Sequence, residues 1–151
     1  MNRKQFSTHL IIAGVVFVSL VFYNYFQAQK NLSTRPSEFD VTLQNTPLES
    51  RVGDQVSFRW LVNSTGSFST ISTAIYWSEN SSPSALTQND SPQAVGYPYQ
   101  TPDYLNGVFT LPDSFDANIV FQSADTIYYR AYAKINGQHY WSDEKKLIIA
   151  N

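Results

Sequence analysis

The chain has 151 residues, of which 42% are hydrophobic and only 15% are charged, and its formal net charge is −2. A chain without a basic patch does not attract nucleic acid, so no nucleic-acid partner is expected. The absence of cysteine excludes disulfides, thiolate metal sites and cysteine nucleophiles. The charged fraction is well below the usual quarter or so, and the many Tyr, Phe, Ser, Thr and Asn residues are typical of a β-rich domain outside the cell.

The first predicted element is a hydrophobic helix. Arg3 and Lys4 precede an apolar run from Leu10 to Phe26. As a helix, this run would span about 25 Å, which is the short end of a membrane crossing. Basic residues before such a run place its N-terminal side in the cytoplasm. A cleaved signal peptide is the alternative, with cleavage after Ala28.

These observations predict four segments along the chain. The cytoplasmic N-terminus covers residues 1–8, a transmembrane signal-anchor helix covers 9–27, and a polar tether covers 28–37. Residues 38–151 then form an extracellular or periplasmic β domain. The predicted location is therefore the cell membrane, crossed once.

The exported part alternates between apolar and polar residues, which is the signature of half-buried strands. The clearest strand is 55–63, and further strands are predicted near 39–43, 71–78, 107–112, 119–121 and 147–150. The residues predicted to face inward are Phe39, Val41, Leu43, Val56, Phe58, Trp60, Val62, Ile71, Thr73, Ile75 and Trp77. Short strands separated by turn signals predict an all-β antiparallel sandwich of about seven strands.

The segment 126–144 predicts a β-hairpin, because Asn136-Gly137 between alternating runs favours a two-residue type I′ turn. Such a turn fixes the register and places three pairs on the outer face: Tyr132 with Trp141, Arg130 with Asp143, and Tyr128 with Lys145. The inner face receives Ile127, Tyr129, Ala131, Ala133, Ile135 and Tyr140. The small Ala residues leave room there for Trp60 or Trp77 from the opposite sheet.

The same register would bring Glu144 to the inner face and send Leu147 and Ile149 outward. A β-bulge shifts the parity of the residues that follow it. We therefore expect a bulge within residues 142–146.

The run Thr126-Ile127-Tyr128-Tyr129-Arg130-Ala131-Tyr132-Ala133, with Trp60 and the segment 74–80, resembles fibronectin type III-like domains of microbial surface proteins. In that family a Thr-aromatic start leads into an alternating penultimate strand that contains Arg-Ala-Tyr-Ala. The resemblance covers residues 38–149 and implies a seven-stranded sandwich without disulfides, used as a spacer or a binding module. One departure is Ile127, which stands where the family has the tyrosine of its corner motif.

Two groups of aromatic residues are the candidate partner-binding sites. The first is Tyr97, Tyr99 and Tyr104, which lie in a long loop, where recognition residues are common. The second is the outward strip of Tyr128, Tyr132 and Trp141. Both groups have a structural alternative, in which the rings cover the sandwich or stabilise their own sheet.

No motif predicts catalysis, and neither a cofactor nor a metal ion is expected. Asp113, Asp116 and Asp125 lack the spacing of a calcium loop, and His139 has no carboxylate pair beside it in sequence. An enzyme or a metal site would require these four residues to converge. Four Asn-x-Ser/Thr triplets, expected in loops or in the tether, are possible glycosylation sites: Asn31, Asn63, Asn80 and Asn89.

The sequence therefore predicts a membrane-anchored, non-catalytic surface module for binding, adhesion or spacing. Its partner is expected to be another surface protein or a glycan. The alternative is a pilin-like filament subunit with the N-terminal helix in the fibre core. Against this alternative, no Gly-bounded processing site precedes the apolar run and no Glu lies early within it.

Overall fold

A computed structural model describes residues 38–151, together with Ser19, Val21 and Tyr23, which are helical. The predicted segments 1–8 and 28–37 lie outside the described residues, as do most of 9–27 and the alternative cleavage site at Ala28. No helix among the described residues is long and apolar enough to cross a membrane. Residues Glu38–Asn151 form one compact unit, and the fold below is that of this unit.

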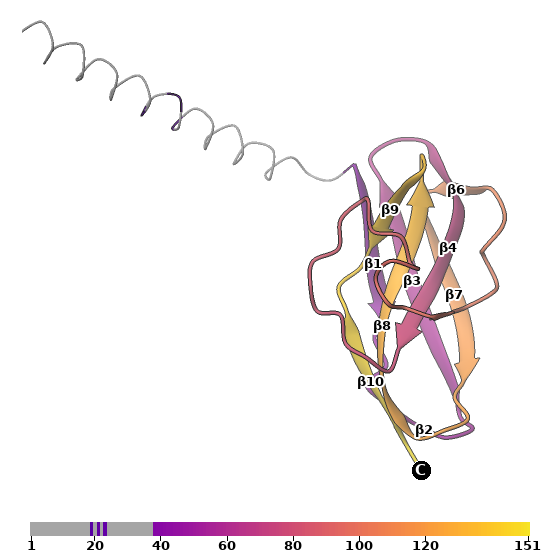
Figure 1. Cartoon of the computed structure of the whole chain (residues 1–151). Coiled ribbons are helices and arrows are strands. Elements are labelled where there is room, and N and C mark those ends of the chain that lie inside the picture. Colours follow the sequence, from indigo (N-terminus) through magenta and orange to yellow (C-terminus); the bar gives the residue numbers. More distant parts are fainter. Residues whose placement is uncertain (1–18, 20, 22, 24–37) are drawn as a thin grey trace, which may run out of the picture. The chain divides into compact units, whose positions relative to one another are not determined.

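The unit is all-β, and its described strands form two sheets (Figure 1). The smaller sheet has the order β1-β3-β7, and the larger has the order β2-β10-β8-β4-β5, with β6 paired to β4 and β9 paired to β8. All pairs are antiparallel except β2 with β10, which is parallel. The strands are β1 (Phe39–Asn45), β2 (Glu49–Arg51), β3 (Gln55–Ser64), β4 (Phe68–Ser78), β5 (Tyr99–Gln100), β6 (Phe109–Leu111), β7 (Asp113–Val120), β8 (Asp125–Ile135), β9 (Gln138–Trp141) and β10 (Lys145–Ala150).

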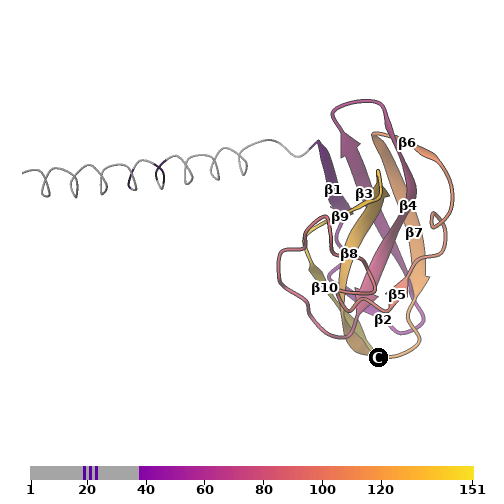
Figure 2. The ribbon, with the colours of Figure 1, turned by 45° about the horizontal axis from the view of Figure 1, so that its top comes forward.

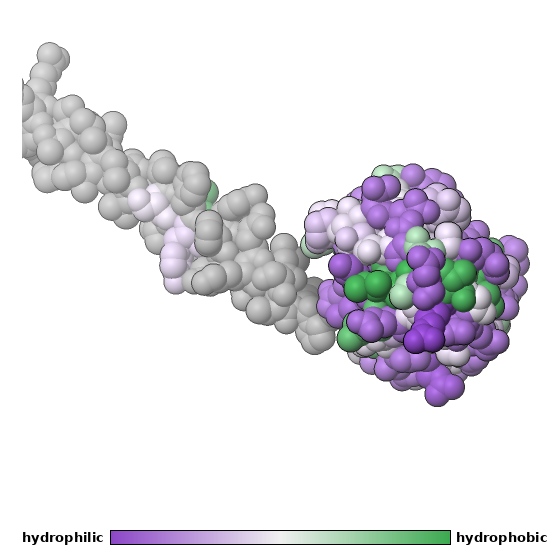
Figure 3. Space-filling view, turned by 90° about the horizontal axis from the view of Figure 1, so that it is seen from below, coloured by the Kyte–Doolittle hydropathy of each residue, from purple (hydrophilic) through white to green (hydrophobic). Residues whose placement is uncertain are grey.

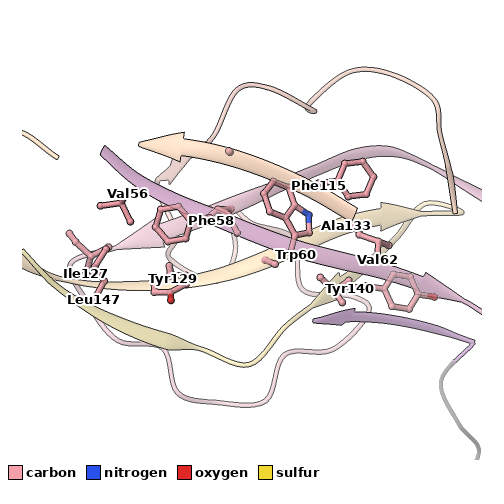
Figure 4. Packing of buried hydrophobic residues seen from close by; sticks show 14 of the residues in the cluster. Val56, Phe58, Trp60, Val62, Phe115, Ile127, Tyr129, Ala133, Tyr140 and Leu147 are labelled. Carbon is pink, nitrogen blue, oxygen red and sulfur yellow. The ribbon is translucent and has the colours of Figure 1, made fainter. Parts of the chain in front are cut away.

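The two sheets enclose one main hydrophobic core (Figure 4). Alternation in β3 points Val56, Phe58, Trp60 and Val62 inward, and all four are buried as predicted. Trp60 crosses the core, where its indole Nε1 donates to Thr73 Oγ1 at 2.7 Å. Thr73 in turn donates to the Tyr132 carbonyl at 2.6 Å, so the buried polar groups satisfy one another. Trp77, the alternative residue predicted to pack against the Ala residues of β8, belongs to β4 in the same sheet. Of the two Trp residues, Trp60 is therefore the one that lies in the opposite sheet.

The predicted hairpin turn and its first register are confirmed. Asn136 and Gly137 have φ of 51° and 80°, the left-handed values that a type I′ turn requires. Tyr132 pairs with Trp141, as predicted from the turn. Tyr129 and Tyr140 are buried in the main core.

The predicted bulge is also confirmed, and Ser142 explains its position. Ala131 N donates to Ser142 Oγ and Ser142 N donates to the Ala131 carbonyl, both at 2.9 Å. A side-chain oxygen thus replaces a backbone acceptor, and the register beyond it shifts by one residue. Leu147 then faces Ile127, and both Leu147 and Ile149 turn inward.

Two predicted pairs are wrong because they ignore this shift. Lys145 pairs with Tyr129 instead of Tyr128, and Lys146 takes the place opposite Tyr128. The same shift removes the pair of Arg130 with Asp143, and the guanidinium of Arg130 donates to Tyr97 and to the Ser142 carbonyl instead.

Three local features of the sandwich differ from the prediction. Ile71 is 53% exposed because the register of β4 shifts between Thr70 and Ser72. The strand predicted at 119–121 overlaps the end of the longer β7, which begins at Asp113 and ends at Val120. The short strand β2 was not predicted at all, since three residues leave no periodic pattern.

Candidate binding site

The long loop of residues 79–98 covers the outer face of the larger sheet (Figures 1 and 2). It does so by building a second, smaller core on outward residues of β4 and β8. Ala74, Tyr76, Tyr97 and Tyr132 are buried there, packed against Leu86, Val95, Leu105 and Trp141. Aromatic rings dominate the contacts: the centroid of Tyr132 lies 4.6 Å from that of Trp141 and 5.2 Å from that of Tyr76. The outer face of β8 is therefore a packed interface, not a free surface.

Arg130 is the polar anchor of this loop. It is only 5% exposed, and its hydrogen-bond partners are all oxygen atoms. Its Nε donates to the Tyr97 hydroxyl and its Nη1 to the Ser142 carbonyl, both at 2.9 Å. Its Nη2 reaches the loop carbonyls of Ser82 at 2.7 Å and Ser84 at 3.2 Å. A planar guanidinium can hold several acceptors in fixed directions, which makes it suited to fastening a loop.

Glu144, which directly precedes β10, belongs to the same hydrogen-bond network. Its carboxylate accepts from the Tyr97 hydroxyl at 2.5 Å, from Ser81 Oγ at 2.6 Å and from the Ser82 amide at 2.7 Å. Burial alone would raise the pKa of Glu144, but these hydrogen bonds and the charge of Arg130 outweigh it and lower the pKa. Burial, and then the hydrogen bond to Glu144, raise the pKa of Tyr97, so its hydroxyl stays protonated.

A second anchor joins the loop to β9. The backbone amide of His139 donates to the Gln88 carbonyl at 3.0 Å, and Trp141 Nε1 donates to the Asp90 carbonyl at 2.9 Å. His139 Nδ1 lies 2.7 Å from the Tyr132 hydroxyl. Burial and the neighbouring Lys134 lower the pKa of His139, so the imidazole is neutral at pH 7.

The six aromatic residues predicted to bind a partner therefore separate into different environments. Tyr97 and Tyr132 are buried in the second core, and Trp141 is half-buried beside them. Tyr104 packs in the main core, 5.2 Å from Phe115 between ring centroids. Tyr128 is half-buried. Tyr99 is the exception, because it is 49% exposed and stacks on Trp77.

Most of these rings therefore pack within the domain, and the prediction that they form two binding surfaces remains a prediction. The structural alternative holds for Tyr97, Tyr104, Tyr132 and Trp141, because covering a sheet face buries more apolar area than displaying rings to water. Among the possible glycosylation sites, Asn80 and Asn89 are exposed in the loop, whereas Asn63 lies in β3 and not in a loop. Asn31 lies outside the described residues.

A groove remains open on this face, and of the six aromatic residues predicted to bind a partner only Tyr97 and Tyr132 line it. It consists of two adjacent depressions of about 480 Å³ and 360 Å³ that share Tyr76, Pro92 and Gln93. The remaining lining residues of the larger depression are Ile71, Ser72, Leu105, Asn106, Gly107, Tyr132, Lys134 and His139. Those of the smaller depression are Ser78, Asn80, Gly96, Tyr97, Pro98 and Gln100.

The lining of this groove is polar but almost uncharged. Gln93, Asn106, Asn80 and Gln100 contribute side-chain amides to the lining, and Lys134 is the one Lys, Arg, Asp or Glu residue in it. The Tyr76 hydroxyl makes no hydrogen bond to the described residues, and burial raises its pKa, so it remains a neutral donor and acceptor. No local signal could have revealed the groove, because its walls come from segments distant in sequence.

The residues considered for metal binding or catalysis do not converge. Asp113 and Asp116 lie in β7 of the smaller sheet, opposite Val62 and Arg59. Asp125 and His139 belong to the larger sheet. Within residues 38–151 and the three described helical positions, no group of three His, Cys, Asp or Glu residues could hold a metal ion.

Comparison with known proteins gives only a general likeness. No protein-family model and no curated protein sequence matches the chain. One similar solved structure is the PKD domain of a peptidase from a Thermoplasmatales archaeon, with a TM-score of 0.48 and 13% identity over 75% of this chain and 93% of that chain. Another is a superoxide reductase (neelaredoxin) from Ignicoccus hospitalis, with a TM-score of 0.43 and 11% identity over 75% and 82% of the two chains.

A third similar structure is the complex of zinc 2-glycoprotein and prolactin inducible protein from human seminal plasma. Its TM-score is 0.39, with 12% identity over 77% of this chain and 97% of that chain. Likeness at this level carries no argument about function. The two-sheet, all-β architecture rests on the strand pairings of the chain itself.

Proposed function

We propose that this protein is a non-catalytic binding module held at the outer surface of a cell membrane. Residues 9–27 would serve as a single-pass anchor, and residues 38–151 would bind a partner outside the membrane. The basic residues ahead of the apolar run support this orientation. The groove on the larger sheet supports the binding role.

The observation that carries the binding role is that the groove is held in shape before any ligand arrives. One wall belongs to the loop 79–98, which Arg130 and Glu144 fasten to the sheet through buried hydrogen bonds. The floor is formed by Tyr76 and Tyr132 on adjacent strands. A binding site on rigid elements loses little conformational entropy when a ligand binds.

The ligand class that fits this groove is an extended, hydroxyl-rich chain such as a glycan. The larger depression falls within the range of about 300–1,000 Å³ that small ligands occupy. Side-chain amides each offer two donors and one acceptor oxygen, which suits hydroxyl groups. A strongly charged ligand would find only Lys134 as a counter-charge.

Three substitutions in the groove test the proposal: Tyr76→Phe, Gln93→Ala and Asn106→Ala, combined in the full-length chain in detergent micelles. Each removes the polar group of a residue that lines the groove, and none of these side chains makes a hydrogen bond to the described residues. Retention on immobilised neutral polysaccharides should fall at least tenfold, because each lost hydrogen bond contributes about 1 kcal/mol. Unfolding by urea should stay unchanged.

The matched control is Gln44→Ala with Gln55→Ala, whose side chains also make no hydrogen bond among the described residues. These residues line a depression on the outer face of the smaller sheet, so the pair should leave retention intact. If the control pair loses retention while the groove variant keeps it, the binding site lies on the smaller sheet. If the unaltered protein retains no glycan, the glycan assignment fails. The partner would then be another protein.

A further inference from the structure

The short strand β2 (Glu49–Arg51) ends the larger sheet, and one of its sides has no strand neighbour among the described residues. On the other side, Ile148 N donates to the Leu48 carbonyl and Val52 N donates to the Ala150 carbonyl, both at 2.9 Å. Because backbone groups alternate along a strand, residues 48, 50 and 52 direct their amides and carbonyls to β10. Those of Glu49 and Arg51 therefore point away from the sheet, and such an edge is a template for a further strand.

The five residues around this edge, Leu48-Glu49-Ser50-Arg51-Val52, are self-complementary. When two copies run antiparallel with Ser50 opposite Ser50, Glu49 of each faces Arg51 of the other, and Leu48 faces Val52. Glu49 and Arg51 are both exposed, and Leu48 and Val52 are 66% and 36% exposed. Opposite charges and apolar groups that face each other across strands are the pairs that stabilise a sheet.

Apolar side chains gather on the same end of the domain (Figure 3). Ile148 beside β2 is 42% exposed, and Val120 at the end of β7 is 45% exposed. The turn after β2 reaches β7's end, where Gly53 N donates to the Phe121 carbonyl at 3.0 Å. Exposed apolar residues that cluster in this way mark interaction surfaces.

This end lies far from the place where the domain begins. β3 starts at Gln55, directly after the β2 turn, and ends at Ser64, which pairs with Phe39 at the start of β1. A ten-residue strand is about 33 Å long. The start of the domain at Glu38 is therefore separated from the β2 edge by the length of the sandwich, within this unit.

We propose that β2 pairs with β2 of a second copy of this chain about a two-fold axis at Ser50, joining two larger sheets into one. Glu49 N would donate to the Arg51 carbonyl of the second copy, Arg51 N to its Glu49 carbonyl, and the axis repeats both bonds. The Arg51 carbonyl already accepts from Asp54 N at 3.1 Å and has a second lone pair for this bond. The contact is isologous, so it closes at a dimer.

The contact is short, so the dimer is expected to be weak in free solution. The dimer does not depend on the proposed glycan binding, because the groove lies over β4 and contains no residue of β2.

Cross-linking tests the axis directly, because the chain has no cysteine. Two Ser50 residues facing each other would form a non-hydrogen-bonded antiparallel pair, with Cα atoms about 4.5 Å apart, which a disulfide can bridge. Ser50→Cys in the full-length chain in micelles should therefore give a disulfide dimer under mild oxidation. Ser114→Cys, exposed on the edge strand β7 of the smaller sheet, is the control, and we expect at least fivefold less dimer. Equal yields from the two variants would overturn the proposal.

Charge reversal in the Ser50→Cys chain tests the pairing. Glu49→Arg alone, or Arg51→Glu alone, places like charges opposite each other and should lower the cross-link yield about tenfold. Both reversals together restore opposite charges and should restore the yield. Circular dichroism of each variant checks that the fold is kept. Failure of the double reversal to rescue the yield, or single reversals without effect, would assign the contact to another part of the chain and refute the proposal.

Discussion

Side chains alternate in the same way on both sheets, but the outer face of the smaller sheet is open to solvent, whereas that of the larger sheet is covered by a loop. On the smaller sheet the outward residues are polar, such as Asp40, Arg59 and Asn118, and this face stays open to solvent. On the larger sheet the outward residues Ala74, Tyr76 and Tyr132 are buried under the loop 79–98. Aromatic residues on the outer face of a sheet can therefore be the ones that a loop of the same domain covers.

The covered face requires side chains that hydrogen-bond to the loop as well as aromatic rings that pack against it. A loop carries many backbone groups that lose water when it packs on a sheet, and each requires a partner. Arg130 and Glu144 provide these partners for the loop carbonyls and for the Ser82 amide. Removing these hydrogen-bonding groups one at a time, with an equivalent change on the open face as the control, tests this contrast.

The largest effect is expected from Arg130→Met. The substitution keeps much of the apolar stem but leaves the Tyr97 hydroxyl and the carbonyls of Ser82, Ser84 and Ser142 without their donor. Loss of one member of a buried charged network costs about 3 kcal/mol, which urea unfolding measures. Arg59→Met on the open face is the control and should change stability by less than about 0.5 kcal/mol. Similar losses for the two variants would show that the two faces do not differ in this way.

A smaller effect is expected from Tyr97→Phe, which removes only the hydroxyl between Arg130 and Glu144. The lost bonds and the donor left unpaired at Arg130 should lower the free energy of unfolding by about 1–2 kcal/mol. Tyr99→Phe is the matched control, because the exposed hydroxyl of Tyr99 has no hydrogen-bond partner among the described residues. If Tyr97→Phe left the free energy of unfolding unchanged, packing alone would hold the loop on the sheet.

The smallest effect is a dependence of stability on pH that passes through Glu144. Folding lowers the pKa of this carboxyl below its ordinary value of 4.5. The ionised form therefore stabilises the folded state above that value, and the contribution is lost as the pH falls through the lowered pKa. Urea unfolding between pH 6 and 3 should show a steeper loss for the unaltered chain than for Glu144→Gln. The difference between the two chains isolates this residue from Asp90, whose pKa is also lowered, mainly by its hydrogen bonds to Thr87. Parallel curves would exclude Glu144 as a source of the acid sensitivity.

Much of the main core could be predicted from the sequence because its signals are local. The alternation of β3 identified four inward residues, and Asn136-Gly137 gave the first register of the hairpin. The bulge was expected from parity alone, since Leu147 and Ile149 would otherwise face outward. Its position could not be foreseen, because it depends on the side chain of Ser142 replacing a backbone acceptor.

The candidate site was not predictable in the same way. Tyr132 and Trp141 looked like binding residues because alternation tells which face a side chain takes but not what covers that face. The covering loop is fastened by bonds between residues that are far apart in the chain, as between Arg130 and Ser82 or Tyr97 and Glu144. The groove exists only where this loop stops short of the strands beside it.

The sequence by itself determined the β class, the inward faces and the type I′ turn, because side-chain period and backbone preference act over a few residues. The tertiary structure decided that most of the aromatic candidates are buried, and that a polar groove and the free edge of β2 remain accessible. These properties depend on which distant segments pack together, and that choice follows from the burial of the whole chain and the satisfaction of its polar groups.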